Sequence, residues 1–414
     1  MASEINWKNI IVCSVAVTLV MVLIEFFLQP TSYVKFDFLK NFSKEMINSQ
    51  YIAPQRLFVN CWRVVRNSYV DETLNNQDWA YWRKRYFKQI KTMDDANVAI
   101  NSMLASLNDP YSKFLLSNSF ARQKMVIDSK ISGVGVLFDK TGDDIVINHV
   151  FANTSAAMEN IQTGDTIVGV NGEETKNISM EKLVEELNSG DEEKVEITIK
   201  RDNVLITKEL TKKDVFVSTM SYEITDDNIG IIKLSSVTGE KAISEFMNIL
   251  FKIDSTKGVI LDLRNNYGGT IVNAILMANL MMNDKEIIRI KSRINREYEI
   301  YTESEKIFKE KPIVILVNGK TASAAEIFAG TLQTNLGAIV VGENTFGKNA
   351  IQQVLPMHNR TGLIITTDKY ILPDGCDIHK VGLTPDIVLK NEKDKDVQLD
   401  EAKKLINEVV KNKK

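Results

Sequence analysis

Residues 313–353 read IVILVNGKTASAAEIFAGTLQTNLGAIVVGENTFGKNAIQQ, and this stretch decides the fold of the chain. Its first five residues form an apolar, β-branched run that predicts a buried strand over 313–317. An amphipathic helix is predicted over 323–334, and a second apolar strand over 338–342. Upstream, a strand is predicted over 258–263 and a helix over 270–283. The alternation predicts a sheet whose strands are joined by crossover helices.

A serine at the mouth of the predicted helix and a lysine in the next loop are the candidate catalytic pair. Ser323 begins the helix, and Glu326 stands three positions later, as in a capping box. Free backbone N–H groups at a helix start stabilise the negative charge that develops during acyl transfer. Lys348 lies in a glycine-bounded loop, where a buried, neutral lysine can activate a serine. We expect Phe346, Ala350 and Ile351 to exclude water from Lys348, and Gln352 to orient it by hydrogen bonding.

Two short motifs in this stretch resemble those of the carboxyl-terminal processing peptidases, which are serine–lysine proteases. Thr321-Ala322-Ser323-Ala324-Ala325-Glu326 is similar to the family's nucleophile motif, and Thr345-Phe346-Gly347-Lys348 to its base motif. Gln352 stands four residues after the lysine, as the family's helper glutamine does. The resemblance implies a ClpP/crotonase-like protease core in which Ser323, Lys348 and Gln352 are catalytic, with no metal and no cofactor.

A third motif, Asn265-Asn266-Tyr267-Gly268-Gly269, follows the predicted strand 258–263. It resembles the family's strand exit, except that Tyr267 stands where the family has proline. The resemblance implies an oxyanion hole formed by Gly268, Gly269 and the N–H of Ala324. A Gly-Gly turn taken alone is also an ordinary structural feature.

Residues 131–210 change to short β-runs between glycines, with a strand ending in a tight Asn171-Gly172 turn. This region resembles a circularly permuted PDZ domain, and Leu107–Leu115 is similar to the signature that precedes it in the family. PDZ domains take an extended peptide as an added strand and hold its terminal carboxylate on backbone N–H groups. The matching loop is Gly133-Val134-Gly135-Val136. The expected partners are therefore proteins or peptides with free C-termini.

The apolar run Ile10–Leu28 is about long enough to span a bilayer. A cleaved signal peptide is the alternative, but Gln29-Pro30 follows the run and no Ala-x-Ala site is present. We expect an uncleaved single-pass anchor in the cell membrane with the catalytic part outside the cytoplasm, a placement that also depends on the family. Of the three cysteines, Cys61 and Cys376 stand alone, so a bridge between them is unsupported by spacing.

The chain has 414 residues, 44% hydrophobic composition and a net charge of −3, which indicates two or three globular domains and no nucleic-acid partner. The aromatic and basic stretch 79–88 is interpreted as a solvated helix. The charged C-terminal helix is a candidate for homo-oligomer contacts. The predicted fold class is α/β, with the following parts: a tail (1–8), an anchor or signal (9–28), a juxtamembrane segment (29–53), a helical domain (54–118), a PDZ domain (119–214), a serine protease core (215–391) and a C-terminal helix (392–414).

Three other functions compete with this interpretation. Residues 342–349 nearly fit a phosphate-binding loop, but Asn349 replaces the hydroxyl that would hold Mg²⁺, a strand is predicted to follow, and the metal candidate Asp262 precedes the loop. A histidine base would have to be His358 or His379. A non-catalytic PDZ scaffold is the third alternative, and the intact Ser323 and Lys348 argue against it.

Overall fold

The computed structural model describes residues 51–142, 144–188, 193–293, 296–303 and 306–412. Its central element is a six-stranded sheet in the order β10-β11-β12-β15-β16-β19. The bounds of these strands are β10 (Met220–Ile224), β11 (Ile229–Leu234), β12 (Gly258–Asp262), β15 (Ile313–Val317), β16 (Ile339–Gly342) and β19 (Ile387–Val388). Every neighbouring pair is parallel except β10 with β11. The predicted βα-alternating core is confirmed.

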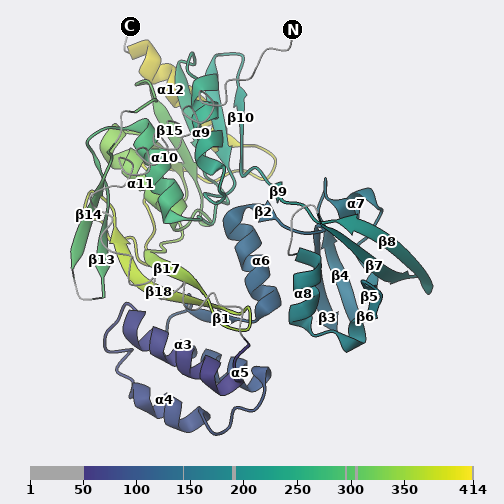
Figure 1. Ribbon diagram of the computed structural model, residues 1–414. Coiled ribbons are helices and arrows are strands. Elements are labelled where there is room, and N and C mark those ends of the chain that lie inside the picture. Colours follow the sequence, from purple (N-terminus) through teal and green to yellow (C-terminus); the bar gives the residue numbers. More distant parts are fainter. Residues whose placement is uncertain (1–50, 143, 189–192, 294–295, 304–305, 413–414) are drawn as a thin grey trace, which may run out of the picture. The chain divides into compact units, whose positions relative to one another are not determined.

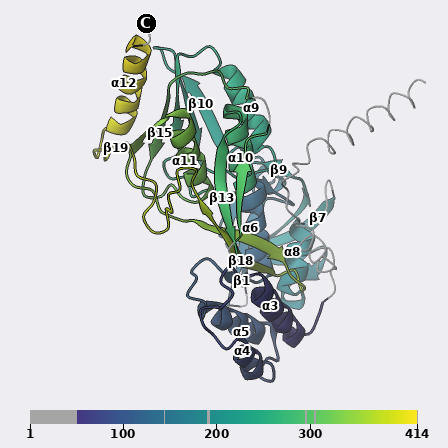
Figure 2. The same cartoon turned by 90° about the vertical axis from the view of Figure 1, so that its left-hand side faces the viewer.

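Helices cover both faces of this sheet, which explains why its inner strands are apolar throughout (Figures 1 and 2). The larger apolar cluster includes α9 (Ala242–Lys252), α10 (Ile271–Met281) and α11 (Ala324–Leu336). The C-terminal helix α12 (Val397–Asn412) packs on the other face through Ala402 and Ile406. The buried side of α12 is therefore used within the chain.

A second, antiparallel sheet brings the N-terminal region to the segment that carries the candidate catalytic lysine. Its order is β1-β18-β13-β14, and β17 also pairs with β18. The strands are β1 (Lys113–Leu115), β13 (Glu286–Ser292), β14 (Glu297–Tyr301), β17 (Ala350–Pro356) and β18 (Gly362–Ile371). Because β1 pairs with β18, the residues just before β1 lie near the loop that leads into β17.

Three helices precede this sheet: α3 (Pro54–Ser68), α4 (Trp79–Tyr86) and α5 (Met93–Ala105). Helix α4 corresponds to the aromatic and basic stretch, and its Trp79 is buried while its arginines are exposed. Cys61 is buried in α3, Cys376 is exposed, and both are free thiols. None of the helices that the structure describes has the length and apolar character required to cross a bilayer. The predicted anchor, 9–28, lies outside the described residues.

The PDZ region forms its own sheet in the order β3-β4-β5-β7-β8, with β6 paired to β5. Its elements are β3 (Val136–Thr141), β4 (Asp144–Val150), α7 (Ser155–Met158), β5 (Thr166–Val170), β6 (Glu173–Glu174), η1 (Thr175–Asn177), α8 (Met180–Asn188), β7 (Lys194–Arg201) and β8 (Val204–Thr211). Helix α6 (Ser117–Asp128) precedes it, and the short strands β2 (Lys130–Ile131) and β9 (Val215–Phe216) pair where the chain enters and leaves the region. The sheet has an apolar core of its own.

Candidate active site

Ser323 lies in the sharp turn between β15 and α11 and has an unusual backbone conformation. Its φ is 56° and its ψ is −122°, a region that residues other than glycine rarely occupy. Strained turns of this kind between a strand and a helix present the nucleophile of many hydrolases. The residue is 8% exposed and stands at the N-terminus of α11. The predicted position at a helix mouth is therefore observed.

The carboxylate of Glu326 joins the serine turn to the lysine loop. It is fully buried and accepts hydrogen bonds from the N–H of Ser323 at 2.7 Å and the N–H of Lys348 at 3.0 Å. It also accepts from the N–H of Gly347 at 2.7 Å and from the hydroxyl of Thr345 at 2.5 Å. The capping-box pattern predicted only the bond to Ser323. The other three bonds make Glu326 the shared support of both candidate catalytic segments.

A second group, the Tyr370 hydroxyl, bridges the same two segments. It lies 2.9 Å from the carbonyl oxygen of Lys348 and 3.2 Å from that of Ser323. Burial, followed by the negative charge of Glu326, raises the pKa of Tyr370 well above its usual value, so the phenol remains a neutral donor. Tyr370 reaches this position from β18, which is distant in sequence. No sequence pattern had singled it out.

The side chain of Lys348 is held by a short chain of hydrogen bonds. Its Nζ donates to Gln352 Oε1 at 2.5 Å, and Gln352 Nε2 donates to the carbonyl oxygen of Tyr111 at 2.6 Å. The Tyr111 ring covers the amine, with its centroid 4.9 Å from Nζ. Phe346 was expected to exclude water here, but it is 52% exposed, and Tyr111 from the N-terminal region covers the amine. The expected contact between Gln352 and Lys348 is present.

The environment of Lys348 lowers its pKa below the usual value of 10.5. Burial is the largest cause, because it disfavours the ammonium. The charges of Asp109 and Glu326 oppose the shift, and that of Lys113 reinforces it. Within the part of the chain that the structure describes, Nζ donates a hydrogen bond to Gln352 and none to the Ser323 hydroxyl. Catalytic hydrogen bonds often form only once substrate is bound.

The expected oxyanion donors lie beside Ser323. Gly268 has a φ of 96°, and a Cβ at this position would lie 2.6 Å from the oxygen of Ala322 and 3.0 Å from the nitrogen of Ala324. Only glycine fits there, and its backbone lies next to the Ala324 N–H. The N–H of Gly268 itself donates to Asn266 Oδ1 at 2.9 Å. Among the described residues, no backbone acceptor engages the N–H of Gly269 or of Ala324, so these two N–H groups remain available as donors.

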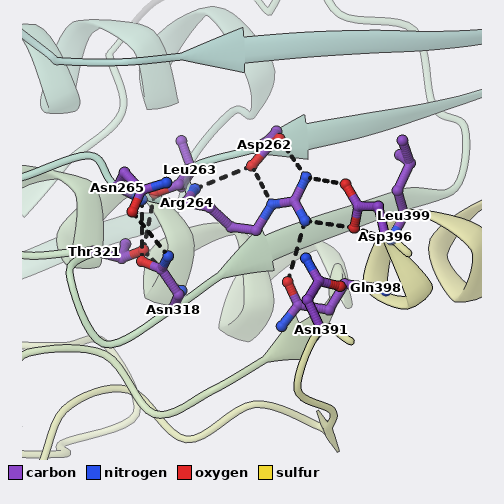
Figure 3. A network of polar contacts seen from close by, with 10 residues as sticks. All are labelled: Asp262, Leu263, Arg264, Asn265, Asn318, Thr321, Asn391, Asp396, Gln398 and Leu399. Carbon is purple, nitrogen blue, oxygen red and sulfur yellow. Dashed lines mark hydrogen bonds and ion pairs between the residues drawn. The ribbon is translucent and has the colours of Figure 1, made fainter. Parts of the chain in front are cut away.

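Hydrogen bonds from asparagine and threonine side chains connect the loop that follows β12 to the serine turn (Figure 3). Asn318 Oδ1 accepts the N–H of Asn265 at 3.0 Å, and Asn318 Nδ2 donates to Asn265 Oδ1 at 3.2 Å. Thr321 Oγ1 donates to the carbonyl oxygen of Leu263 at 2.8 Å. These bonds hold the loop that carries the two glycines close to the turn that carries Ser323.

Arg264 extends this network to the C-terminal helix (Figure 3). Its guanidinium contacts Asp262 at 2.8 Å and Asp396, immediately before α12, at 2.6 Å. Burial lowers the pKa of Arg264, but the hydrogen bonds that its guanidinium donates to the two carboxylates raise it on balance. A polar cavity of about 360 Å³ lies here, lined by Asp262, Arg264, Asp396 and Gln398 among others. Neither Ser323 nor Lys348 lines it.

The predicted peptide-binding loop of the PDZ region is buried and leads into the edge strand β3. The N–H of Val134 donates to the carbonyl oxygen of Leu187 in α8 at 3.0 Å. The carbonyl oxygen of Gly135 accepts from the N–H of Phe151 at 3.0 Å. β3 pairs with β4 on one side only. Its other edge is the place where an added strand would pair.

The structure argues against two of the alternatives, a phosphate-binding loop and a histidine base. A phosphate-binding loop offers free backbone N–H groups to an anion. Here, the N–H groups of Gly347 and Lys348 are already taken by the Glu326 carboxylate, and the strand β17 follows the loop. Within the described residues, no hydrogen bond joins His358 or His379 to Ser323, and the Nδ1 atoms of both imidazoles are buried without a partner.

Two parts of the chain match known protein families. Residues 228–389 match peptidase family S41, and residues 125–200 match the PDZ domain. The chain is 31% identical over 351 residues to the carboxyl-terminal-processing protease of Synechocystis sp., and the match covers 82% of each chain. It is 32% identical over 303 residues to the carboxy-terminal processing protease CtpA of Bacillus subtilis, covering 72% of this chain and 65% of that one.

Among solved structures, the chain resembles a photosystem II D1 C-terminal processing protease. The identity is 26% and the TM-score 0.52, and the match covers 82% of this chain and 94% of that one. The chain belongs to the carboxyl-terminal-processing proteases of peptidase family S41. It is a serine-type peptidase with a PDZ domain and the mixed α/β fold of that family.

Proposed function

We propose that this protein is a membrane-anchored endopeptidase that cleaves proteins near their C-terminus through a Ser323–Lys348 dyad. One observation carries the proposal. The buried Glu326 carboxylate and the Tyr370 hydroxyl each contact both the serine turn and the lysine loop, so these two segments are held together. Burial of a carboxylate costs free energy, which its hydrogen bonds to four donors offset. A buried group bonded in this way is typical of a functional site whose geometry must be held in place.

Acylation begins with an uncharged Lys348. Its amine donates to Gln352 Oε1, which leaves the nitrogen lone pair free to accept the hydroxyl proton of Ser323. Oγ attacks the substrate carbonyl carbon, and the N–H groups of Ala324 and Gly269 stabilise the oxyanion. The C–N bond then breaks, and the lysine ammonium passes its proton to the leaving amine. The products are an acyl-enzyme ester and the released C-terminal fragment.

Deacylation repeats these steps with water. Lys348, neutral again, removes a proton from a water molecule that attacks the ester, and returns the proton to Ser323 Oγ as the ester bond breaks. Gln352 keeps the amine in place through both half-reactions because Tyr111 anchors its amide. No metal or organic cofactor takes part in these steps.

The PDZ domain supplies the preference for C-terminal tails in this proposal. An apolar tail would add to the free edge of β3 and direct the preceding chain toward Ser323. The loop Gly133–Val136, where β3 begins, would receive the terminal carboxylate. Support for this role comes from the family match of residues 125–200 and from the unpaired edge of β3.

The membrane anchor is proposed from the apolar sequence Ile10–Leu28. We expect the full chain to remain with membranes after a high-salt wash and to be released by detergent. A chain that starts at residue 29 should be recovered without detergent. Recovery of the full chain in the salt wash would contradict the anchor and would leave the catalytic proposal unaffected.

The pH dependence of acylation tests the proposed base. Only neutral Lys348 can accept the serine proton, so the rate should rise with pH as the ammonium loses its proton. Because burial lowers the pKa of Lys348, the midpoint of this rise should fall below the 10.5 of an ordinary lysine. The measurement is kcat/KM for a soluble fluorogenic peptide, with circular dichroism recorded at each pH. A rise centred on the ordinary lysine value would contradict the role of Lys348.

A further inference from the structure

Helix α6 lies where the PDZ domain would accept a substrate tail. β3 is an edge strand, so the backbone groups on its free side are the ones that an added peptide strand would bind. One of these groups already has a partner. The side-chain amide of Asn118, in the first turn of α6, donates to the carbonyl oxygen of Phe138 in β3 at 2.8 Å. A side-chain N–H thus occupies an acceptor that a peptide N–H would use.

Two further contacts hold α6 on the same edge. Arg122, one turn after Asn118, forms an ion pair with Asp139 of β3, in which its second nitrogen lies 3.1 Å from Oδ2. Ala121 packs against the apolar core of the PDZ region. Helix α6 also contacts α8, whose last turn accepts the N–H of Val134 (Figure 1). The helix therefore contacts the edge strand, the domain's core and its long helix.

The opposite side of α6 is attached to the protease core. Phe120 packs so closely on β18 that a Cβ at Gly362 would lie 2.1 Å from its ring. At the C-terminal end, the carbonyl oxygen of Ile127 accepts the N–H of Gly239 at 3.0 Å. The residues that face the PDZ domain and those that face the core are different, so the two sets of contacts can be changed separately.

We propose that α6 is an intramolecular occupant of the PDZ peptide site, and that a substrate tail can add to β3 only after Asn118 and Arg122 have released that edge. The inference rests on the proposed role of the PDZ domain in tail capture. Its thermodynamic consequence is competition. The apparent association constant for a tail is the intrinsic constant multiplied by the fraction of molecules in which the edge of β3 is free.

The test is the affinity of the full chain for a tail peptide. The probe is a fluorescein-labelled decapeptide with three apolar C-terminal residues and a free carboxylate, and the chain carries Ser323→Ala to prevent cleavage. Replacing both Asn118 and Arg122 with alanine should tighten binding about tenfold, since one hydrogen bond and one partly exposed ion pair no longer compete. Val126→Ala, at an exposed position of the same helix, should leave the affinity unchanged.

Unchanged or weaker binding by the double variant would overturn the proposal. Removing the α6 contacts that compete with the tail peptide for β3 should only strengthen the binding of that peptide. Hydrogen exchange of the chain with native α6 gives a second readout that does not depend on the variant's folding. Saturating peptide should speed amide exchange in α6 and slow it in β3. Slower exchange in α6 would also overturn the proposal. Failure of the protease assignment itself would appear separately, as absent cleavage of a tailed substrate by the chain that retains Ser323.

Discussion

Replacing either Ser323 or Lys348 with alanine should lower the cleavage rate by about 10³-fold or more. Replacing both should lower it no further. The two side chains carry one proton transfer between them, so loss of either partner removes the same step. Lys348 cannot be replaced by another base, because Gln352 and Tyr111 enclose its amine and neither is basic. The measurement is single-turnover cleavage of a protein substrate with a free apolar C-terminus.

Lys320→Ala provides the matched control, because Lys320 is an exposed lysine in the same turn as the nucleophile. It should retain the parent rate. All variants should show the same far-ultraviolet circular dichroism and urea midpoint to within about 1 M, since truncation at these two positions deletes no core side chain. A Lys348→Ala enzyme that retains more than about a tenth of the rate would exclude lysine as the base.

The core of the fold could be predicted because its strands are buried on both sides and read as continuous apolar runs. β12, β15 and β16 lie within one or two residues of the predicted bounds, as does α11. The strands β13 and β14 carry alternating charges and gave no comparable signal. Helix α6 was also missed, because its contacts are partly polar and its apolar residues Phe120 and Ala121 pack on two different partners, so no single apolar face marks it in sequence.

The residues of the candidate site likewise fall into those that the sequence identifies and those that it does not. Ser323, Lys348 and Gln352 fall within one stretch of thirty residues, where local motifs can identify them. Tyr111 and Tyr370 reach Lys348 through the pairing of β1 and β17 with β18, and strand pairing between distant segments cannot be derived from a single sequence. Glu326 was visible as a capping residue. Its contacts with the lysine loop depend on the parallel pairing of β15 and β16, which brings the two strand exits together.

Replacing Glu326 with glutamine should damage both stability and catalysis. Its two oxygens accept four hydrogen bonds in a fully buried position, and an amide presents an N–H₂ group in place of one oxygen. At least one backbone N–H would then lose its acceptor, which costs about 1–3 kcal/mol of unfolding free energy. Because the same bonds set the separation of the serine turn and the lysine loop, kcat should fall about 100-fold while KM changes little.

The loss of negative charge in the same substitution should shift the pKa of Lys348 in a definite direction. The negative charge of Glu326 stabilises the Lys348 ammonium and so raises the lysine pKa, against the larger effect of burial. Removal of that charge should move the midpoint of the pH–rate profile to a lower pH than that of the parent enzyme, which a purely structural defect would not do. Glu343→Gln, a carboxylate in the same loop whose contact with Lys390 is a surface pair at 3.7 Å, should change neither stability nor midpoint. A Glu326→Gln enzyme with reduced stability but full kcat would show that the carboxylate supports the fold without positioning the dyad.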